Sequence, residues 1–228
     1  KITAYLCYNK AMKFKAIVFD MDGVLVDSER FHSKVLDNFF VESGIDASHL
    51  TPKDFVGSVL KDMWPKVLRD EFTEAHAAQV HQEFLDYDAQ FPIPYKELLL
   101  PGVTDALKTF SEKGYKMAVA SSSRRHEIAE VLDTHDLRQY FEFFLSGQDE
   151  FEQSKPNPAI YLAAMEKLGV EPSETLIIED SHYGIMAGKA AGATVWAVKD
   201  NYFGINQEQA DRFIETLTDA KNLLAESE

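Results

Sequence analysis

The sequence predicts an α/β protein in which a doubly wound parallel sheet carries an inserted all-helical cap domain. Short apolar runs recur along the 228 residues, and stretches with helical periodicity separate most of them. This alternation is typical of parallel strands joined by crossover helices. After the first run, a stretch of roughly 70 residues contains no convincing strand, and that length is within the range of small domains.

The predicted strands are buried on both faces, because apolar side chains occupy successive positions rather than alternate ones. Many of these side chains are β-branched or aromatic, which favours extended backbone. Strands are expected at Ala16–Phe19, Met117–Ala120, Phe143–Leu145, Leu176–Ile178 and Val195–Val198. Together they would form the sheet of a Rossmann-like core.

Helices of the core are expected between those strands, where apolar residues recur with a period near 3.6. They are predicted at Val103–Lys113, His126–Thr134, Pro158–Leu168 and Ile185–Ala191. Gly114, Gly169 and Gly192 each directly follow one of these segments. Glycine at that position is typical of a helix C-terminus.

Residues 28–97 are predicted to form the helical cap, and residues 12–27 and 98–228 together form the α/β core. Cap helices are expected at Arg30–Ser43, Pro52–Val56, Val59–Arg69 and Thr73–Ala89. Prolines then cluster between residues 92 and 101 and mark the return to the α/β pattern.

Composition narrows the class of protein. Hydrophobic residues make up 45% of the chain, which argues against global disorder. The formal net charge is −15 without a cluster of Lys or Arg, so no nucleic-acid partner is expected. No apolar run approaches the ~20 residues of a membrane span.

Cys7 is the single cysteine and fits a reducing compartment. Residues 1–11 are interpreted as an extension whose origin the sequence leaves open. We expect a cytoplasmic protein without membrane association or an obligate protein partner.

Two carboxylates follow the first predicted strand. Asp20 and Asp22, with Gly23 behind them, stand where the carboxyl end of a strand places ligands in open α/β sheets. Acids so close together at the exit of a buried strand are costly without a cation, and Mg²⁺ prefers such oxygen ligands. Taken alone, the same pattern is also typical of an Asp-rich surface turn.

Polar residues follow two further strands. The run Ser121–Ser123 offers hydroxyls and backbone N–H groups for an anion, although serines also cap helices. Glu179 and Asp180 could cap the next helix or complete a metal site. Lys155 stands in a proline-rich turn, where a lysine is ordinarily solvated. We expect all of these groups to meet at one edge of the sheet.

In this order the motifs resemble the haloacid dehalogenase superfamily, in its branch related to β-phosphoglucomutase. The matching text is Phe19-Asp20-Met21-Asp22-Gly23-Val24-Leu25-Val26-Asp27-Ser28-Glu29, then Ser121, Lys155-Pro156, Glu179-Asp180-Ser181 with Gly184-Ile185, and Ala190-Ala191-Gly192. The similarity extends from about Phe14 to Ala197. A helical cap after the first motif is also a feature of this branch.

The resemblance implies an enzyme, a phosphomonoester hydrolase that forms an aspartyl-phosphate. It implies that Asp20 is the nucleophile, and that Asp22 protonates the leaving oxygen and then helps to deprotonate water. Mg²⁺ is expected as the cofactor, held by Asp20, the Asp22 backbone carbonyl and Asp180, with Glu179 assisting. Positive charge is needed because a carboxylate and a phosphate dianion repel one another.

The resemblance further implies that Ser121, Ser122 and Lys155 hold the phosphoryl oxygens. The expected substrate is a small phosphorylated metabolite, in the first place a sugar phosphate. His81, on a predicted cap helix, is expected to be solvated.

The alternative activity is that of a β-phosphoglucomutase-type phosphohexomutase. His32 matches a histidine of those mutases, and His32 and Lys61 are candidate substrate-contacting residues of the cap. Mutases also carry an arginine shortly after the glycine that Gly57 matches, but Leu60 stands there. This departure favours a phosphatase. A third alternative, a phosphate sensor without catalysis, has no need of both Asp20 and Asp22.

Overall fold

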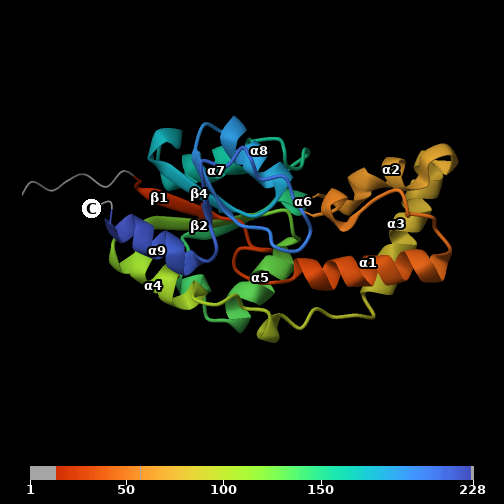
Figure 1. Cartoon of the computed structure of the whole chain (residues 1–228), viewed down its shortest axis with the longest axis horizontal. Coiled ribbons are helices and arrows are strands. Elements are labelled where there is room, and N and C mark those ends of the chain that lie inside the picture. Colours follow the sequence, from red (N-terminus) through yellow and green to blue (C-terminus); the bar gives the residue numbers. More distant parts are fainter. Residues whose placement is uncertain (1–13, 57, 227–228) are drawn as a thin grey trace, which may run out of the picture.

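The computed structural model describes residues 14–56 and 58–226. A six-stranded parallel sheet lies at the centre of this part of the chain, with the order β3-β2-β1-β4-β5-β6 (Figure 1). The strands are β1 Ala16–Phe19, β2 Lys116–Ser121, β3 Phe143–Ser146, β4 Thr175–Glu179, β5 Thr194–Val198 and β6 Arg212–Ile214. The five predicted strands are confirmed. The edge strand β6 was not predicted, because it has three residues of which two are exposed.

Helices cover both faces of the sheet, as a doubly wound fold requires. They are α4 Val103–Glu112, α5 Arg125–Thr134, α6 Gly147–Glu150, α7 Ala159–Leu168, α8 His182–Ala190 and α9 Leu217–Glu226. Figure 1 shows α4, α5 and α9 on one face and α7 and α8 on the other. Within β1, Ile17 and Phe19 pack with the first group, while Ala16 and Val18 pack with the second. The predicted fold class is therefore confirmed.

The segment between β1 and β2 contains helices and no sheet strand among its described residues. It comprises α1 Glu29–Ser43, α2 Trp64–Leu68 and α3 Glu74–Asp88, with short 3-10 helices at Pro52–Asp54, Leu60–Met63, Arg69–Glu71 and Tyr95–Glu97. The predicted helix Val59–Arg69 is broken into three pieces. Pro65 lies in the first turn of α2, the position that a residue without an N–H tolerates best. Arg69 ends that helix with a φ of 47°.

The cap has a hydrophobic cluster of its own. Phe39 and Phe40 of α1 pack against Trp64 and Val67 of α2 and Val80 of α3. Figure 1 shows these helices at one end of the molecule, beyond the carboxyl ends of the central strands.

Two chain segments connect the cap to the core, and they pair with each other. Val26 and Leu99 form an antiparallel bridge. The Asp27 N–H donates to the Leu98 carbonyl at 2.8 Å, and the Leu100 N–H donates to the Leu25 carbonyl at 2.9 Å. The predicted domain boundaries fall at this pairing and stay predictions.

Some sequence-based interpretations lie outside the described residues, namely those on residues 1–11, Cys7 and Gly57. Within the described part, no helix has the length and apolar character that crossing a membrane requires.

Strand order determines where a ligand can bind. β1 is central and pairs with β2 on one side and β4 on the other. From β1 the chain continues to β2 on one side, and from β4 it continues to β5 on the other side. In such sheets this reversal of strand order opens a crevice at the carboxyl ends of the strands, here between β1 and β4. The Asp20 N–H donates to the Ile178 carbonyl at 2.9 Å, so the ladder extends to the first residue of the acidic motif.

Candidate active site

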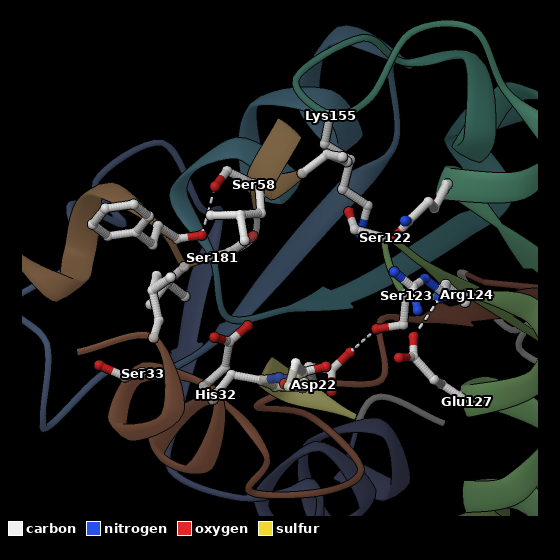
Figure 2. A pocket seen from close by; sticks show the side chains of 18 of the residues that line it. Asp22, His32, Ser33, Ser58, Ser122, Ser123, Arg124, Glu127, Lys155 and Ser181 are labelled. Atoms are coloured by element: carbon white, nitrogen blue, oxygen red, sulfur yellow. Dashed lines mark hydrogen bonds between the residues drawn. The ribbon is translucent and has the colours of Figure 1, made fainter. Parts of the chain in front are cut away.

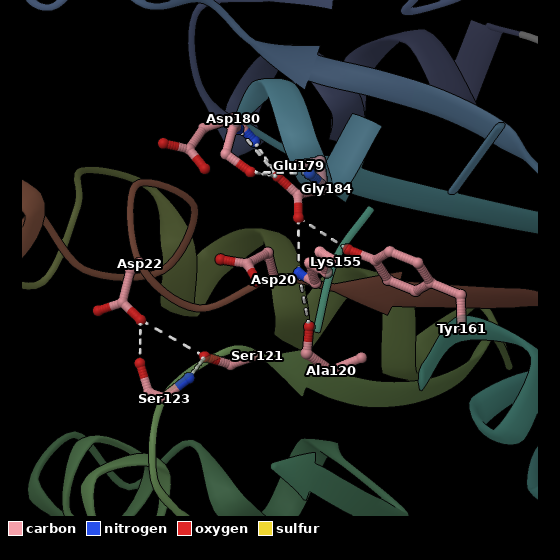
Figure 3. Close-up of polar contacts among 11 residues, drawn as sticks. Asp20, Asp22, Ala120, Ser121, Ser123, Lys155, Tyr161, Glu179, Asp180 and Gly184 are labelled. Carbon is pink, nitrogen blue, oxygen red and sulfur yellow. Dashed lines mark hydrogen bonds and ion pairs between the residues drawn. The ribbon is translucent and has the colours of Figure 1, made fainter. Parts of the chain in front are cut away.

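The motifs of β1, β2 and β4 converge at the carboxyl end of the sheet, as predicted (Figure 3). They line a cavity of about 180 Å³ that lies between the sheet and the cap helices. Asp20, Asp22, Ser122, Lys155 and Asp180 all contribute to its wall.

Lys155 is the cation at the base of this cavity. Its Nζ donates to Asp20 Oδ1 at 2.6 Å, to Glu179 Oε1 at 2.7 Å and to the Ala120 carbonyl at 3.2 Å. The residue is 5% exposed, so it is not solvated as a lysine in a proline-rich turn ordinarily is. Because Lys155 bonds one oxygen of Asp20, the carboxylate is fixed while its Oδ2 has no hydrogen bond to a described residue.

Glu179 supports Lys155 and is fully buried. Its Oε1 accepts from Lys155 and, at 2.8 Å, from the Tyr161 hydroxyl. Its Oε2 accepts from the N–H groups of Asp180 and Ser181, both at 2.9 Å. Burial alone would raise the pKa of Glu179, but the charge and hydrogen bond of Lys155 lower it. Both oxygens are thus occupied by protein donors, which differs from the predicted role beside a metal.

Two glycines make room for these carboxylates. A Cβ on Gly184 would lie 1.6 Å from Glu179 Oε1. A Cβ on Gly23 would lie 2.0 Å from Asp180 Oδ2, and Gly23 has a φ of +75°. Side chains at these positions are incompatible with the observed placement of Glu179 and Asp180.

Asp22 is oriented by hydroxyl groups rather than by Lys155. The Ser28 hydroxyl donates to Oδ1, and the Ser123 hydroxyl donates to Oδ2 at 2.6 Å. The Ser121 hydroxyl lies 3.4 Å from the same Oδ2 (Figure 3). Neither Ser28 nor Ser123 was predicted as a site residue. Ser123 belongs to the serine run of the sequence analysis, whereas Ser28 was named there only as part of the matching text and was given no role.

The predicted phosphate-binding serines divide into two roles. Ser122 lines the cavity. Ser121 is fully buried, and its Oγ accepts from the Ser123 N–H at 3.0 Å while facing Asp22. Ser121 therefore supports the wall from behind. Figure 2 shows Ser122 and Ser123 beside Arg124, on the wall opposite His32.

Negative charge exceeds positive charge at the strand ends. Burial raises the pKa of Asp20 to about 7, because desolvation and the charges of Glu179 and Asp22 outweigh the opposing effect of Lys155. Burial also raises the pKa of Asp180 well above its ordinary value, with Glu179, Glu29, Asp20 and Asp22 adding to the effect. A bound cation would relieve this excess.

The donors fit a magnesium ion better than a metal held entirely by side chains. No group of three or more His, Cys, Asp or Glu side chains within residues 14–56 and 58–226 is arranged as a ready metal site. Mg²⁺ ordinarily takes one or two carboxylates and fills its remaining positions with water and substrate oxygens. Asp20 and Asp180, with the Asp22 backbone carbonyl, could hold such an ion.

Of the cap residues that the sequence analysis named, Lys61 and His81 lie elsewhere than expected, while His32 lies where it was expected. His32 lines the cavity, as expected of a substrate-contacting residue, but Lys61 is exposed and Leu60 takes its place in the wall. His81 was expected to be solvated, yet it lines the cavity and its Nδ1 is buried. The sequence-based prediction also missed Asp88, because helical periodicity alone does not show which face of α3 meets the core.

Comparison with known proteins agrees with this geometry. Residues 17–198 match the family model described as haloacid dehalogenase-like hydrolase. The chain is 30% identical over 211 residues to a phosphoglycolate phosphatase of Aquifex aeolicus, covering 92% of this chain and 96% of that protein. It is 32% identical over 180 residues to hexitol phosphatase B of Escherichia coli K12, covering 77% and 79%.

A solved structure shares the fold. The β-phosphoglucomutase of Clostridium difficile superposes with a TM-score of 0.78 at 22% identity, covering 94% of this chain and 96% of that one. The family model spans all of the motifs that line the cavity, from Asp20 to Asp180. The expectation of a hydrolase is confirmed, and the chain belongs to the haloacid dehalogenase-like hydrolase family.

Proposed function

We propose that the protein is a Mg²⁺-dependent phosphatase of a small phosphorylated metabolite, with Asp20 as the covalent nucleophile. The observation that carries the proposal is the arrangement of Asp20, whose Oδ1 is held by Lys155 while Oδ2 has no described hydrogen-bond partner beside the cavity. Relatives named phosphoglycolate phosphatase, hexitol phosphatase B and phosphorylated carbohydrates phosphatase support the reaction class.

In the first step, an Asp20 oxygen attacks phosphorus and the bond to the leaving oxygen breaks. Asp22 gives its proton to that oxygen, so the leaving group departs as a neutral alcohol. In the second step, water attacks the aspartyl-phosphate, Asp22 takes the proton of the water, and inorganic phosphate leaves. Ser122 and Lys155 contact the phosphoryl oxygens in this proposal.

Mg²⁺ would be held by Asp20, Asp180 and the Asp22 carbonyl, and it would supply the positive charge that offsets repulsion between carboxylate and phosphate. Lys155 supplies a second positive charge through its ion pair with Asp20 Oδ1. Glu179 and Tyr161 hold that lysine in place.

The cap favours a phosphatase over a phosphohexomutase. A mutase must hold a bisphosphate, whose second phosphate calls for a cation on the cap side. Leu60, at the position that matches the arginine of those mutases, lines the wall, and Lys61 is exposed and does not line it.

The test is phosphate release from p-nitrophenyl phosphate and a panel of sugar, polyol and short-chain acid phosphates, with Mg²⁺ or with EDTA. We expect Mg²⁺-dependent release, and a loss of roughly a thousandfold or more in Asp20→Asn. Undiminished release in Asp20→Asn would contradict the mechanism. Interconversion of β-glucose 1-phosphate and glucose 6-phosphate with little free phosphate would establish the mutase instead, and no activity on any substrate would leave the sensor.

A further inference from the structure

The cap half of the cavity holds polar side chains for which the phosphoryl-transfer steps have no use. His32 on α1 and both His81 and Asp88 on α3 line this half. Apolar side chains surround them, among them Leu36, Val59, Leu60, Phe84 and Leu85. A few convergent polar groups on an apolar wall are typical of a site that orients a ligand.

Asp88 contributes a carboxylate to this half of the cavity. It is half-buried, and it makes neither a hydrogen bond nor an ion pair with any residue in the described part of the chain. Burial raises its pKa, while the nearby charges of His32 and Arg124 act in the opposite direction. Asp86, two residues earlier on the same helix, is exposed and accepts a hydrogen bond from Gln82 at 2.9 Å. Asp88 is thus the one of this pair that is turned toward the cavity.

His81 offers an imidazole about two helical turns earlier on α3, and it lines the same cavity. Its Nδ1 is buried without a hydrogen-bond partner among the described residues. The Trp64 ring packs edge-on against the His81 ring at 6.1 Å between centroids, which fixes the orientation of the imidazole. Burial lowers the pKa of His81, and the charges of Arg124 and Lys61 lower it further. At neutral pH the ring is therefore a hydrogen-bonding group without a charge.

Charge decides what this half of the cavity can accept. The described cap residues that line it include no Lys or Arg. Arg124 and Glu127 stand on the core wall, and Glu29 at the start of α1 lines the cavity from the cap. A second phosphate or a carboxylate on the leaving group would thus approach Asp88 with only His32 and Arg124 to offset the repulsion, in a cavity that Glu29 and Glu127 also line. Neutral hydroxyl groups meet no such penalty, because a carboxylate accepts two hydrogen bonds from neighbouring hydroxyls.

We propose that Asp88 and His81 form a hydroxyl-recognition subsite, which selects phosphomonoesters of neutral polyhydroxy compounds over those with an acidic leaving group. The inference rests on the proposed phosphatase function and specifies the substrate class. Between the activities named for the relatives, it favours that of the hexitol phosphatase over that of the phosphoglycolate phosphatase. A site built to bond hydroxyls rejects analogues without them, because its buried polar groups are then left unpaired.

The experiment compares kcat and KM for a hexitol 6-phosphate, 2-phosphoglycolate and p-nitrophenyl phosphate. We expect wild-type kcat/KM to be highest for the hexitol phosphate. In Asp88→Asn, the ratio of kcat/KM for the hexitol phosphate to that for p-nitrophenyl phosphate should fall about 10- to 100-fold, mainly through KM. The matched control Asp86→Asn should keep this ratio within about twofold of wild type, since an exposed side-chain pair contributes little.

His81→Phe keeps the ring that packs against Trp64 and removes the nitrogens, so it should lower the same ratio. A wild-type preference for 2-phosphoglycolate would overturn the subsite, as would unchanged ratios in both Asp88→Asn and His81→Phe. Absence of phosphate release from all three compounds would instead contradict the phosphatase function itself.

Discussion

At the scale of single residues, the site depends on a buried network around one lysine. Four contacts define it: Lys155 to Asp20, Lys155 to Glu179, Tyr161 to Glu179, and the Lys155 ammonium over the Tyr161 ring at 4.9 Å from its centroid. Tyr161 is fully buried on α7 and does not line the cavity. We expect it to be a positioning residue, since it is linked to Asp20, the proposed nucleophile, through Glu179 and Lys155.

Tyr161→Phe removes the hydroxyl and keeps the ring over Lys155. We expect kcat to fall about three- to tenfold with little change in KM, because a hydrogen bond to a charged partner is lost but the substrate contacts stay. The free energy of unfolding should fall by about 1 kcal/mol. Steady-state kinetics and urea unfolding measure both effects.

The control is Tyr140→Phe, since the Tyr140 hydroxyl has no hydrogen bond to a described residue and the ring only packs against the core. An equal loss of kcat in both variants would mean that Tyr161 contributes packing alone.

The sequence predicted which residues converge more reliably than what each one contacts. Asp20, Asp22, Lys155 and Asp180 were placed together because each follows a strand or a turn at the same sheet edge. The role of Glu179 could not be read in this way. One of its hydrogen bonds comes from Tyr161, which lies 18 residues earlier on a helix. The pattern of apolar residues in the sequence does not indicate that contact.

At the scale of elements, a loop after β5 is held by one carboxylate. Asp200 accepts from the N–H groups of Tyr202 and Phe203, both at 2.8 Å, and of Ile205 at 2.6 Å. Partial burial would raise the pKa of Asp200, but these backbone donors outweigh it and lower the pKa. The folded pKa is therefore below the unfolded value. The stabilisation is present above the unfolded pKa and is lost as pH falls through the folded one.

Asp200→Asn should reduce the free energy of unfolding by about 1 kcal/mol at pH 7, a modest loss because the carboxylate is partly solvated. The difference from wild type should narrow below about pH 4, where the wild-type carboxylate takes up a proton. Urea unfolding from pH 3 to 7 measures it, with the exposed Asp70→Asn as control. A gap that stays constant down to pH 3 would exclude this carboxylate as the source.

The strand that was not predicted, β6, is also the one whose sequence lacks a continuous apolar run. β1, β2 and β4 are continuous apolar runs, so their positions were predicted to within one or two residues. β6 has Arg212 and Phe213 exposed, and the pattern of a buried strand is absent. It is recognisable through its pairing with β5, which is a tertiary contact.

At the scale of the whole molecule, the cavity exists because the cap closes over the sheet. The sequence predicted both units and the insertion point from alternation and its interruption. It could not predict the face that the cap presents, because His81, Leu60 and Asp88 reach the cavity through the packing of α1 to α3 on one another.

A hydrogen bond joins the cap to the loop that carries Lys155. Ser154 directly precedes Lys155 in the sequence. Its hydroxyl donates to Asp62 Oδ2 at 2.9 Å. The bond is exposed, so it contributes little to the free energy of unfolding. In the proposed mechanism the chemistry is shielded from bulk water and the product must leave, so we expect the cap to open and close. The same bond then stabilises the closed arrangement relative to the open one.

Ser154→Ala should raise KM about two- to fivefold and leave the melting temperature nearly unchanged, since roughly 0.5–1 kcal/mol is lost from the closed state alone. Asp62→Ala should have a similar effect. In the double variant the two effects on KM should not add, because either substitution removes the same bond. Additive effects, or a KM equal to wild type in each single variant, would show that this bond does not govern closure. A clear fall in melting temperature together with the rise in KM would mean that the bond stabilises the folded protein as a whole rather than the closed arrangement.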